Sequence, residues 1–176
     1  GNTLLRAERC ADAVARFDRV AHEFPSSRFV SPALYNAGLC LQEAGDLAGA
    51  VRRYGELVRV VPASTDVRHA RLQMAAALVG LERWPEAIEQ ADTLLGRDDL
   101  DESERLESLA RRAQALLGLR RLEDAEAAAR STMSYFRVHR DALPDEHFAA
   151  AGQFVLAETL RERAEEIDIP SADALT

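Results

Sequence analysis

The chain of 176 residues contains no lysine, and all 22 of its basic residues are arginine. Aromatic residues make up only 6% of it and β-branched residues are few, whereas alanine and leucine dominate, a mix that favours helix over strand. The formal net charge of −8 argues against a general attraction to nucleic acid or to an anionic membrane. There is no run of about 18 apolar residues, so the sequence predicts no membrane span.

The sequence also lacks the motifs of common catalytic and cofactor sites. It has no G-x-S-x-G, no phosphate-binding loop and no H-E-x-x-H. Cys10 and Cys40 fit no zinc or redox spacing; we expect two half-buried residues in helices, and their pairing in a disulfide stays open. The acidic run 98–102 lacks the spacing of a calcium loop and predicts a helix N-terminus. Four histidines form no metal-binding pair: His22, His69, His139 and His147. These absences predict a protein that is not an enzyme and holds no metal or cofactor.

A repeat of about 37 residues runs through the chain. One series of small residues comprises Ala13, Ala50, Ala87 and Ala125. A second series with nearly the same period comprises Gly1, Gly38, Ala75, Ala113 and Gly152. Close crossing of two helices requires Gly or Ala, because larger side chains hold the backbones apart. The two series therefore predict a stack of helix hairpins, in which we expect Gly38 to face Ala50 across one crossing.

Turn and capping residues divide the repeats into helices. Gly45 and Asp46 predict a helix stop followed by an N-cap, and Asp101 with Glu104 resembles a capping box. No strand pattern competes with these signals. We expect about nine helices, near residues 1–7, 10–24, 32–44, 47–60, 66–81, 84–96, 101–119, 122–138 and 144–168.

The segment from Ser31 to Ser64 resembles the tetratricopeptide repeat family. It carries Leu34-Tyr35-Asn36 with Gly38, Gly45-Asp46-Leu47, Ala50 with Tyr54, and Pro62. The resemblance implies an all-α fold, a right-handed α-solenoid of antiparallel helix hairpins that forms one domain over residues 1–168. Its repeats and flanking parts would be approximately 1–27, 28–64, 65–99, 100–138, an unpaired C-terminal helix at 144–168 and a tail at 169–176.

The loop from Pro25 to Ser31 makes the repeat longer than the family's usual length. In this it is similar to bacterial cell-envelope members, such as the outer-membrane assembly lipoproteins and the Tol–Pal coordinator. The bias toward arginine and alanine is typical of a GC-rich genome, which also favours a bacterial source. The resemblance points to the periplasm or envelope, with the cytoplasm as the alternative. The first residue is not Met, so we expect a fragment, and a lost signal peptide stays open.

The family resemblance implies an interaction scaffold whose first helices line a concave groove that binds a protein or peptide. A self-assembly module that forms homo-oligomers through its terminal repeats is the alternative. Carrying the family's groove positions over gives Tyr35, Asn36, Leu39, Gln42, His69, Leu72, Gln73, Ala76, Ala110, Arg111, Gln114, Leu117, Ala149 and Gln153. We expect Tyr35 to be the main anchor, because rigid aromatic side chains dominate interfaces. We expect Arg53 and Glu126 to lie on the outer face, so that replacing both should leave partner binding intact.

The last helix should close the stack. Its apolar residues run from Phe148 to Leu160 and are followed by charged residues from Arg161 onward. We expect the apolar part to dock on the preceding hairpin and the charged end to project free into solvent. At the other end, we expect Leu4 and Leu5 to lack partners.

Overall fold

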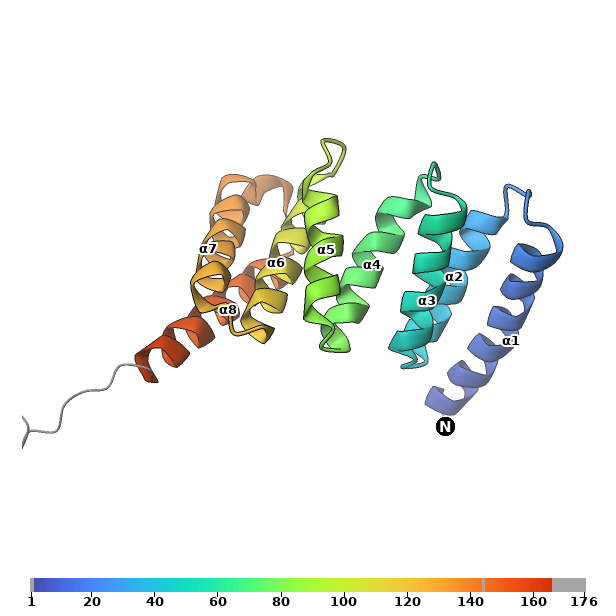
Figure 1. Ribbon diagram of the computed structural model, residues 1–176, viewed down its shortest axis with the longest axis horizontal. Coiled ribbons are helices and arrows are strands. Elements are labelled where there is room, and N and C mark those ends of the chain that lie inside the picture. The colour runs from blue at the N-terminus through green and yellow to red at the C-terminus, as the bar shows by residue number, and fades with distance from the viewer. Residues whose placement is uncertain (1, 144, 166–176) are drawn as a thin grey trace, which may run out of the picture.

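The computed structural model describes residues 2–143 and 145–165, with side chains from Arg9 onward. Within these ranges it is entirely helical, which confirms the predicted fold class. The helices stand side by side in chain order and form an elongated stack (Figure 1). Their bounds are α1 Asn2–Glu23, α2 Val30–Glu43, α3 Leu47–Val60, α4 Asp66–Gly80, α5 Trp84–Leu95, α6 Glu102–Gly118, α7 Leu122–Val138, the 3₁₀ turn η1 Arg140–Ala142, and α8 His147–Glu165.

The N-terminal part is one helix, where the sequence predicted two. The described residues therefore contain eight α-helices and not nine, because α1 runs without interruption from Asn2 to Glu23. The expected turn near residues 8–9 contains neither glycine nor proline, so nothing there breaks the helical hydrogen bonds. The described part of α1 consequently packs on α2 and forms no hairpin of its own. Gly1, the side chains of Leu4 and Leu5, and the tail 169–176 lie outside the described residues.

Three hairpins follow, and each closes through the same turn. The second residue after each first helix has a left-handed backbone, at Gly45 with φ 87°, at Glu82 with φ 56° and at Arg120 with φ 56°. In each turn the next residue's N–H bonds back to a carbonyl five residues earlier, as Asp46 does to Leu41. This pattern is a Schellman motif. The repeat period thus reappears in the backbone even where glycine is absent.

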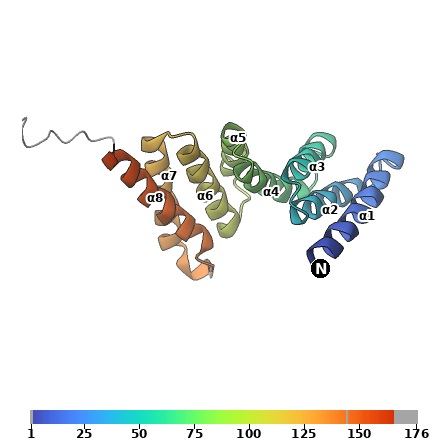
Figure 2. The same ribbon diagram turned by 90° about the horizontal axis from the view of Figure 1, so that it is seen from below.

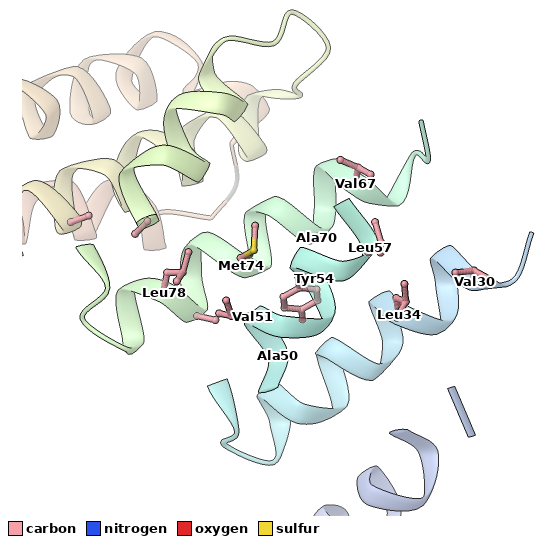
Figure 3. Close-up of a cluster of buried hydrophobic side chains, with 13 residues drawn as sticks. Val30, Leu34, Ala50, Val51, Tyr54, Leu57, Val67, Ala70, Met74 and Leu78 are labelled. Carbon is pink, nitrogen blue, oxygen red and sulfur yellow. The ribbon is translucent and has the colours of Figure 1, made fainter. Parts of the chain in front are cut away.

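The small residues of both series from Gly38 onward are buried, whereas Ala13 is only partly buried. Ala50, Ala87 and Ala125 have no exposed surface. The atoms nearest to Gly38 belong to the ring of Tyr54, which lies on α3 one turn after Ala50. Tyr54 is fully buried in a cluster contributed mainly by α2, α3 and α4, with Leu34, Leu57 and Leu78 among its members (Figure 3).

The last described helix closes the stack only in part. Gly152 lies against Thr132 of α7, and Val155 is fully buried. Phe154 and Leu160, however, are 60% and 47% exposed, so Leu160 does not dock as expected. The charged end is not free up to residue 165, because Arg163 forms an ion pair with Glu126 of α7. A carboxylate on the neighbouring helix holds this end in place.

A second ion pair joins the charged end of α8 to the neighbouring hairpin. Arg120 Nη1 lies 3.0 Å from Glu162 Oε2, and this ion pair joins the α6–α7 turn to α8.

Within the described residues, no helix combines the length and the apolar character that crossing a membrane would require.

Candidate functional site: the face of the first helices

The first helices of successive hairpins line one side of the stack. Besides its neighbours in the chain, α4 packs against both α2 and α6, and α6 packs against α8. Seen from below, α3 and α5 lie on the side opposite α2 and α4 (Figure 2). In a curved stack, equivalent helices approach each other most closely on the inner side, so α2, α4, α6 and α8 form the inner face.

At the N-terminal end of this face, aromatic and amide side chains hold each other in position. The half-exposed Tyr35 ring lies 6.0 Å from the Tyr54 ring and 6.4 Å from His69, measured between ring centroids. Tyr54 Oη donates a hydrogen bond to Gln42 Oε1 at 3.2 Å, and Gln42 Nε2 donates to Gln73 Oε1 at 3.1 Å. The chain of bonds fixes the amides of α2 and α4 relative to each other.

Two acidic side chains act on Tyr35. Burial raises the pKa of Tyr35, and the charges of Asp66 and Glu107 raise it further. Burial is also the largest cause of the raised pKa of Tyr54, and the charges of Tyr35 and Glu43 add to it. Tyr35 therefore stays protonated at neutral pH and can donate a hydrogen bond from a partly dry position.

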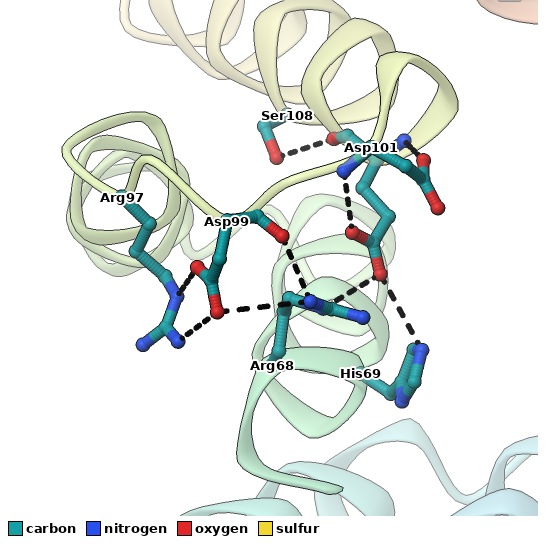
Figure 4. A network of polar contacts seen from close by, with 7 residues as sticks. Arg68, His69, Arg97, Asp99, Asp101 and Ser108 are labelled. Carbon is teal, nitrogen blue, oxygen red and sulfur yellow. Dashed lines mark hydrogen bonds and ion pairs between the residues drawn. The ribbon is translucent and has the colours of Figure 1, made fainter. Parts of the chain in front are cut away.

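In the middle of the face, an ionic network joins α4 to the loop before α6 (Figure 4). Arg68 Nε lies 2.9 Å from Glu104 Oε1, and Arg68 Nη1 donates to the Asp99 carbonyl oxygen at 2.9 Å. His69 Nε2 lies 3.4 Å from the same Glu104 oxygen. Glu104 is only 7% exposed and completes the predicted capping box with Asp101. The network therefore sets the position of one hairpin relative to the next.

At the C-terminal end of the face, Arg111 links α6 to α8. Its guanidinium lies 5.4 Å from the centre of the Phe148 ring, a cation–π distance. Arg111 also donates to Glu107 Oε1 and to Gln114 Oε1, each at 3.3 Å. Burial raises the pKa of Glu107, and the charges of Arg111 and His147 oppose the rise. The result is a half-buried acid–base pair beside an aromatic ring.

Most of the predicted groove residues are accessible in the structure, but some are buried and can no longer be counted as part of a binding surface. Leu72, Ala110 and Ala149 are buried between helices, so they cannot contact a partner. Gln153 is exposed but lines a hollow between α7 and α8. The others are at least partly exposed on α2, α4 and α6: Tyr35, Asn36, Leu39, Gln42, His69, Gln73, Ala76, Arg111, Gln114 and Leu117.

Three residues of this face were missed from the sequence, namely Glu107, His147 and Phe148. Glu107 lies one helical turn before Arg111, so the i, i+4 spacing of opposite charges could have identified it. The contact between Phe148 and Arg111 joins two helices, and no local pattern announces it.

The side chains of the face suit non-covalent binding. They supply aromatic surface, amides and one acid–base pair, all held by neighbours on adjacent helices. Among the described residues, no group of three or more His, Cys, Asp or Glu side chains is arranged to hold a metal ion. His139 is occupied by stacking on Tyr135, with ring centroids 4.3 Å apart.

Comparisons with known proteins agree with this architecture. No curated protein sequence matches the chain. A solved structure of a MamA RS-1 double mutant superposes with a TM-score of 0.58 at 18% identity, over 90% of this chain and 89% of that one. MamA 41-end from Desulfovibrio magneticus RS-1 superposes with a TM-score of 0.51 at 14% identity, over 92% and 98%. These likenesses concern the fold.

The match to a sequence family is more specific than these structural likenesses, but it covers fewer residues. The tetratricopeptide repeat family matches residues 32–64, which span α2, α3 and the segment up to Ser64. Tetratricopeptide solenoids generally serve as scaffolds for protein–protein interaction. Residues 32–64 thus match one tetratricopeptide repeat, and the described chain as a whole shares an all-helical fold with the solved structures.

Proposed function

We propose that this protein binds a partner protein, as a peptide or a helix, along the inner face formed by α2, α4 and α6. The observation that carries the proposal is the set of accessible side chains Tyr35, His69 and Arg111 on successive first helices, each of which contacts a neighbour on its own or an adjacent helix. Side chains that are already ordered lose little conformational entropy when a partner binds.

The charges of the face narrow the partner's chemistry. Glu107 and Asp66 place negative charge near Tyr35, whereas Arg111 carries a cation shared between Glu107 and Phe148. A peptide with one basic residue facing α4 and one acidic or aromatic residue facing Arg111 would complement both. The chain's net charge of −8 likewise favours a basic partner.

Photo-crosslinking tests the face directly. A photoreactive amino acid at Asn36, which is exposed on α2, should capture the partner in cells of the source organism. The same group at Arg59, exposed on α3, should not. Equal capture from both positions would contradict binding on the inner face.

Self-assembly is the second candidate, and the open side of α8 favours it. Phe154 and Leu160 are exposed on the last described helix, where a further repeat of a solenoid would stack. Light scattering on the purified chain separates the two functions. A monomer whose mass does not change with concentration would rule out self-assembly through α8.

A place in a bacterial envelope complex is the finer part of the proposal. It rests on the loop with Phe24, Pro25 and Ser27, which resembles that of envelope tetratricopeptide proteins. Fractionation of cells that produce the native full-length protein tests it, and recovery with the cytoplasmic fraction alone would refute it.

A further inference from the structure

The two cysteines lie next to each other at the interface between α1 and α2. Cys10 belongs to α1 and is 8% exposed, and Cys40 belongs to α2 and is half-buried. Both thiols line one surface hollow, together with Arg9, Ala13 and Glu43. Thirty positions apart in the sequence, they are brought together only because α1 packs along α2.

The two free thiols share one local environment. Burial is the largest of the causes that raise the pKa of the Cys40 thiol to about 11, and the neighbouring Cys10 and the charge of Glu43 contribute to the same rise. Because both cysteines line the same small hollow between α1 and α2, a change of side-chain rotamer can bring their sulfur atoms to bonding distance. The open hollow gives a small reagent access to the pair.

We propose that Cys10 and Cys40 form a reversible disulfide that ties α1 to α2. The oxidant would be a low-molecular-weight disulfide. The thiolate of one cysteine attacks it, forms a mixed disulfide and releases one thiol. The other cysteine then loses its proton and attacks the protein sulfur of the mixed disulfide, which expels the second thiol. Two protein thiols are oxidised, and one small disulfide is reduced to two thiols.

The crosslink would act on the least supported helix of the described stack. Interior helices are covered on both sides, whereas α1 packs on α2 and reaches α3 through the ion pair of Asp18 with Arg53, at 2.7 Å. A terminal helix of a solenoid unfolds first, because each unit is stabilised only by its neighbours. A bond between Cys10 and Cys40 removes that local unfolding without touching the inner face. The proposal is independent of the partner-binding function.

Oxidised glutathione is the probe, used on the native folded protein. We expect a monomer that has lost the mass of two hydrogen atoms, has no thiol reactive to a labelling reagent, and regains both thiols with dithiothreitol. We also expect slower hydrogen exchange in α1 and a rise of the melting temperature by about 5 °C or more. Because thiolate is the attacking form, the reaction should accelerate as pH rises from about 7 to 9.

Single variants provide the controls. Cys10→Ala and Cys40→Ala should each keep the helical circular dichroism of the parent and should show no gain in melting temperature with oxidised glutathione. Two thiols that stay free, a stable glutathione adduct, or dimers joined by disulfides would each overturn the proposal. An equal gain of stability in the single variants would overturn it as well.

Discussion

Gly38 of α2 lies directly against the ring of Tyr54 in α3: a Cβ atom at Gly38 would be 2.7 Å from Tyr54 Cδ1. A glycine also lies against a large ring between two neighbouring hairpins, where a Cβ at Gly118 of α6 would lie 2.8 Å from Cζ2 of Trp84 in α5. The small residue at position 38 thus makes room for a buried aromatic ring. Real Cβ atoms do not approach ring carbons so closely, and the ring is enclosed by the core.

Gly38→Ala should destabilise the protein by about 1–3 kcal/mol, because the new methyl group must displace the Tyr54 ring. Gly55→Ala is the matched control. A Cβ there meets nothing within 4 Å, so the change should stabilise α3 by about 0.5–1 kcal/mol through helix propensity. Urea unfolding followed by circular dichroism measures both. Equal effects of the two changes would contradict the close approach of Gly38 to Tyr54.

Glu82→Gly should stabilise the protein. Glu82 holds a left-handed backbone with φ 56°, which costs a side-chain-bearing residue about 1–2 kcal/mol. Glycine removes that strain but loses about 0.5–1 kcal/mol through the entropy of the unfolded chain. The expected net gain is about 0.5–1 kcal/mol, measured as a shift of the urea midpoint.

The equivalent turn supplies the reverse experiment. Gly45 has φ 87°, so Gly45→Ala should destabilise by about 1 kcal/mol. Glu82→Ala keeps a Cβ in the strained position and should bring no gain. A gain as large as that of Glu82→Gly would show that the loss of the carboxylate, and not the backbone, is responsible.

These turns show how far the sequence predicts the fold. Local signals placed the hairpins well, since Gly45, Asp46 and the Asp101–Glu104 capping box act on their own neighbours. Glu82 and Arg120 carry the same turn without any residue preference that announces it. In α1 the reverse happened, because the repeat period predicted a turn where the residues favour continuous helix.

The candidate site was less predictable than the fold. Family positions point to α2, α4 and α6, whose accessible residues stay candidates, but they include Leu72 and Ala110, which packing between repeats buries. Which side of a helix its neighbour covers depends on the rotation from one repeat to the next, and that rotation is set by contacts such as Arg68 with Glu104. Such contacts join residues far apart in the chain, so no local pattern specifies them.

Glu107→Gln should raise stability at neutral pH and lose this effect in acid. Burial raises the pKa of Glu107, so the folded state holds its proton more tightly than the unfolded state does. The stabilising contribution of protonated Glu107 is complete below the unfolded pKa and is lost as pH rises through the folded pKa. Glutamine resembles the protonated acid and removes this dependence.

Unfolding free energies of the parent and of Glu107→Gln should therefore converge near pH 4 and diverge toward pH 7. Arg111 keeps its hydrogen bond to Gln114 and its contact with Phe148 in the variant, so the inner face stays intact. A variant that is less stable at neutral pH would show that the attraction between Glu107 and Arg111 outweighs the burial of the carboxylate.

Binding on the inner face can be tested with one added charge. Asn36→Arg places a long cation on the exposed surface of α2 beside Tyr35, and the structure gives the Asn36 side chain no bond that the change would break. Loss of a hot spot weakens association by about 2 kcal/mol or more, so affinity for the partner should fall at least about 30-fold. Calorimetry with the crosslinked partner, once purified, measures the affinity, and the melting temperature should stay within about 2 °C.

The control is Ala127→Arg, which adds the same charge at an exposed position of α7. It replaces the expected outer-face pair, because Arg53 is tied to Asp18 and Glu126 to Arg163, and both contacts hold helices together. Since both variants change the net charge equally, a long-range electrostatic effect would weaken binding alike in the two. Loss confined to Asn36→Arg places the partner on the inner face. Loss confined to Ala127→Arg would put it on the side of α7, and the residues proposed here would then line an unused surface of a solenoid that is otherwise correctly described.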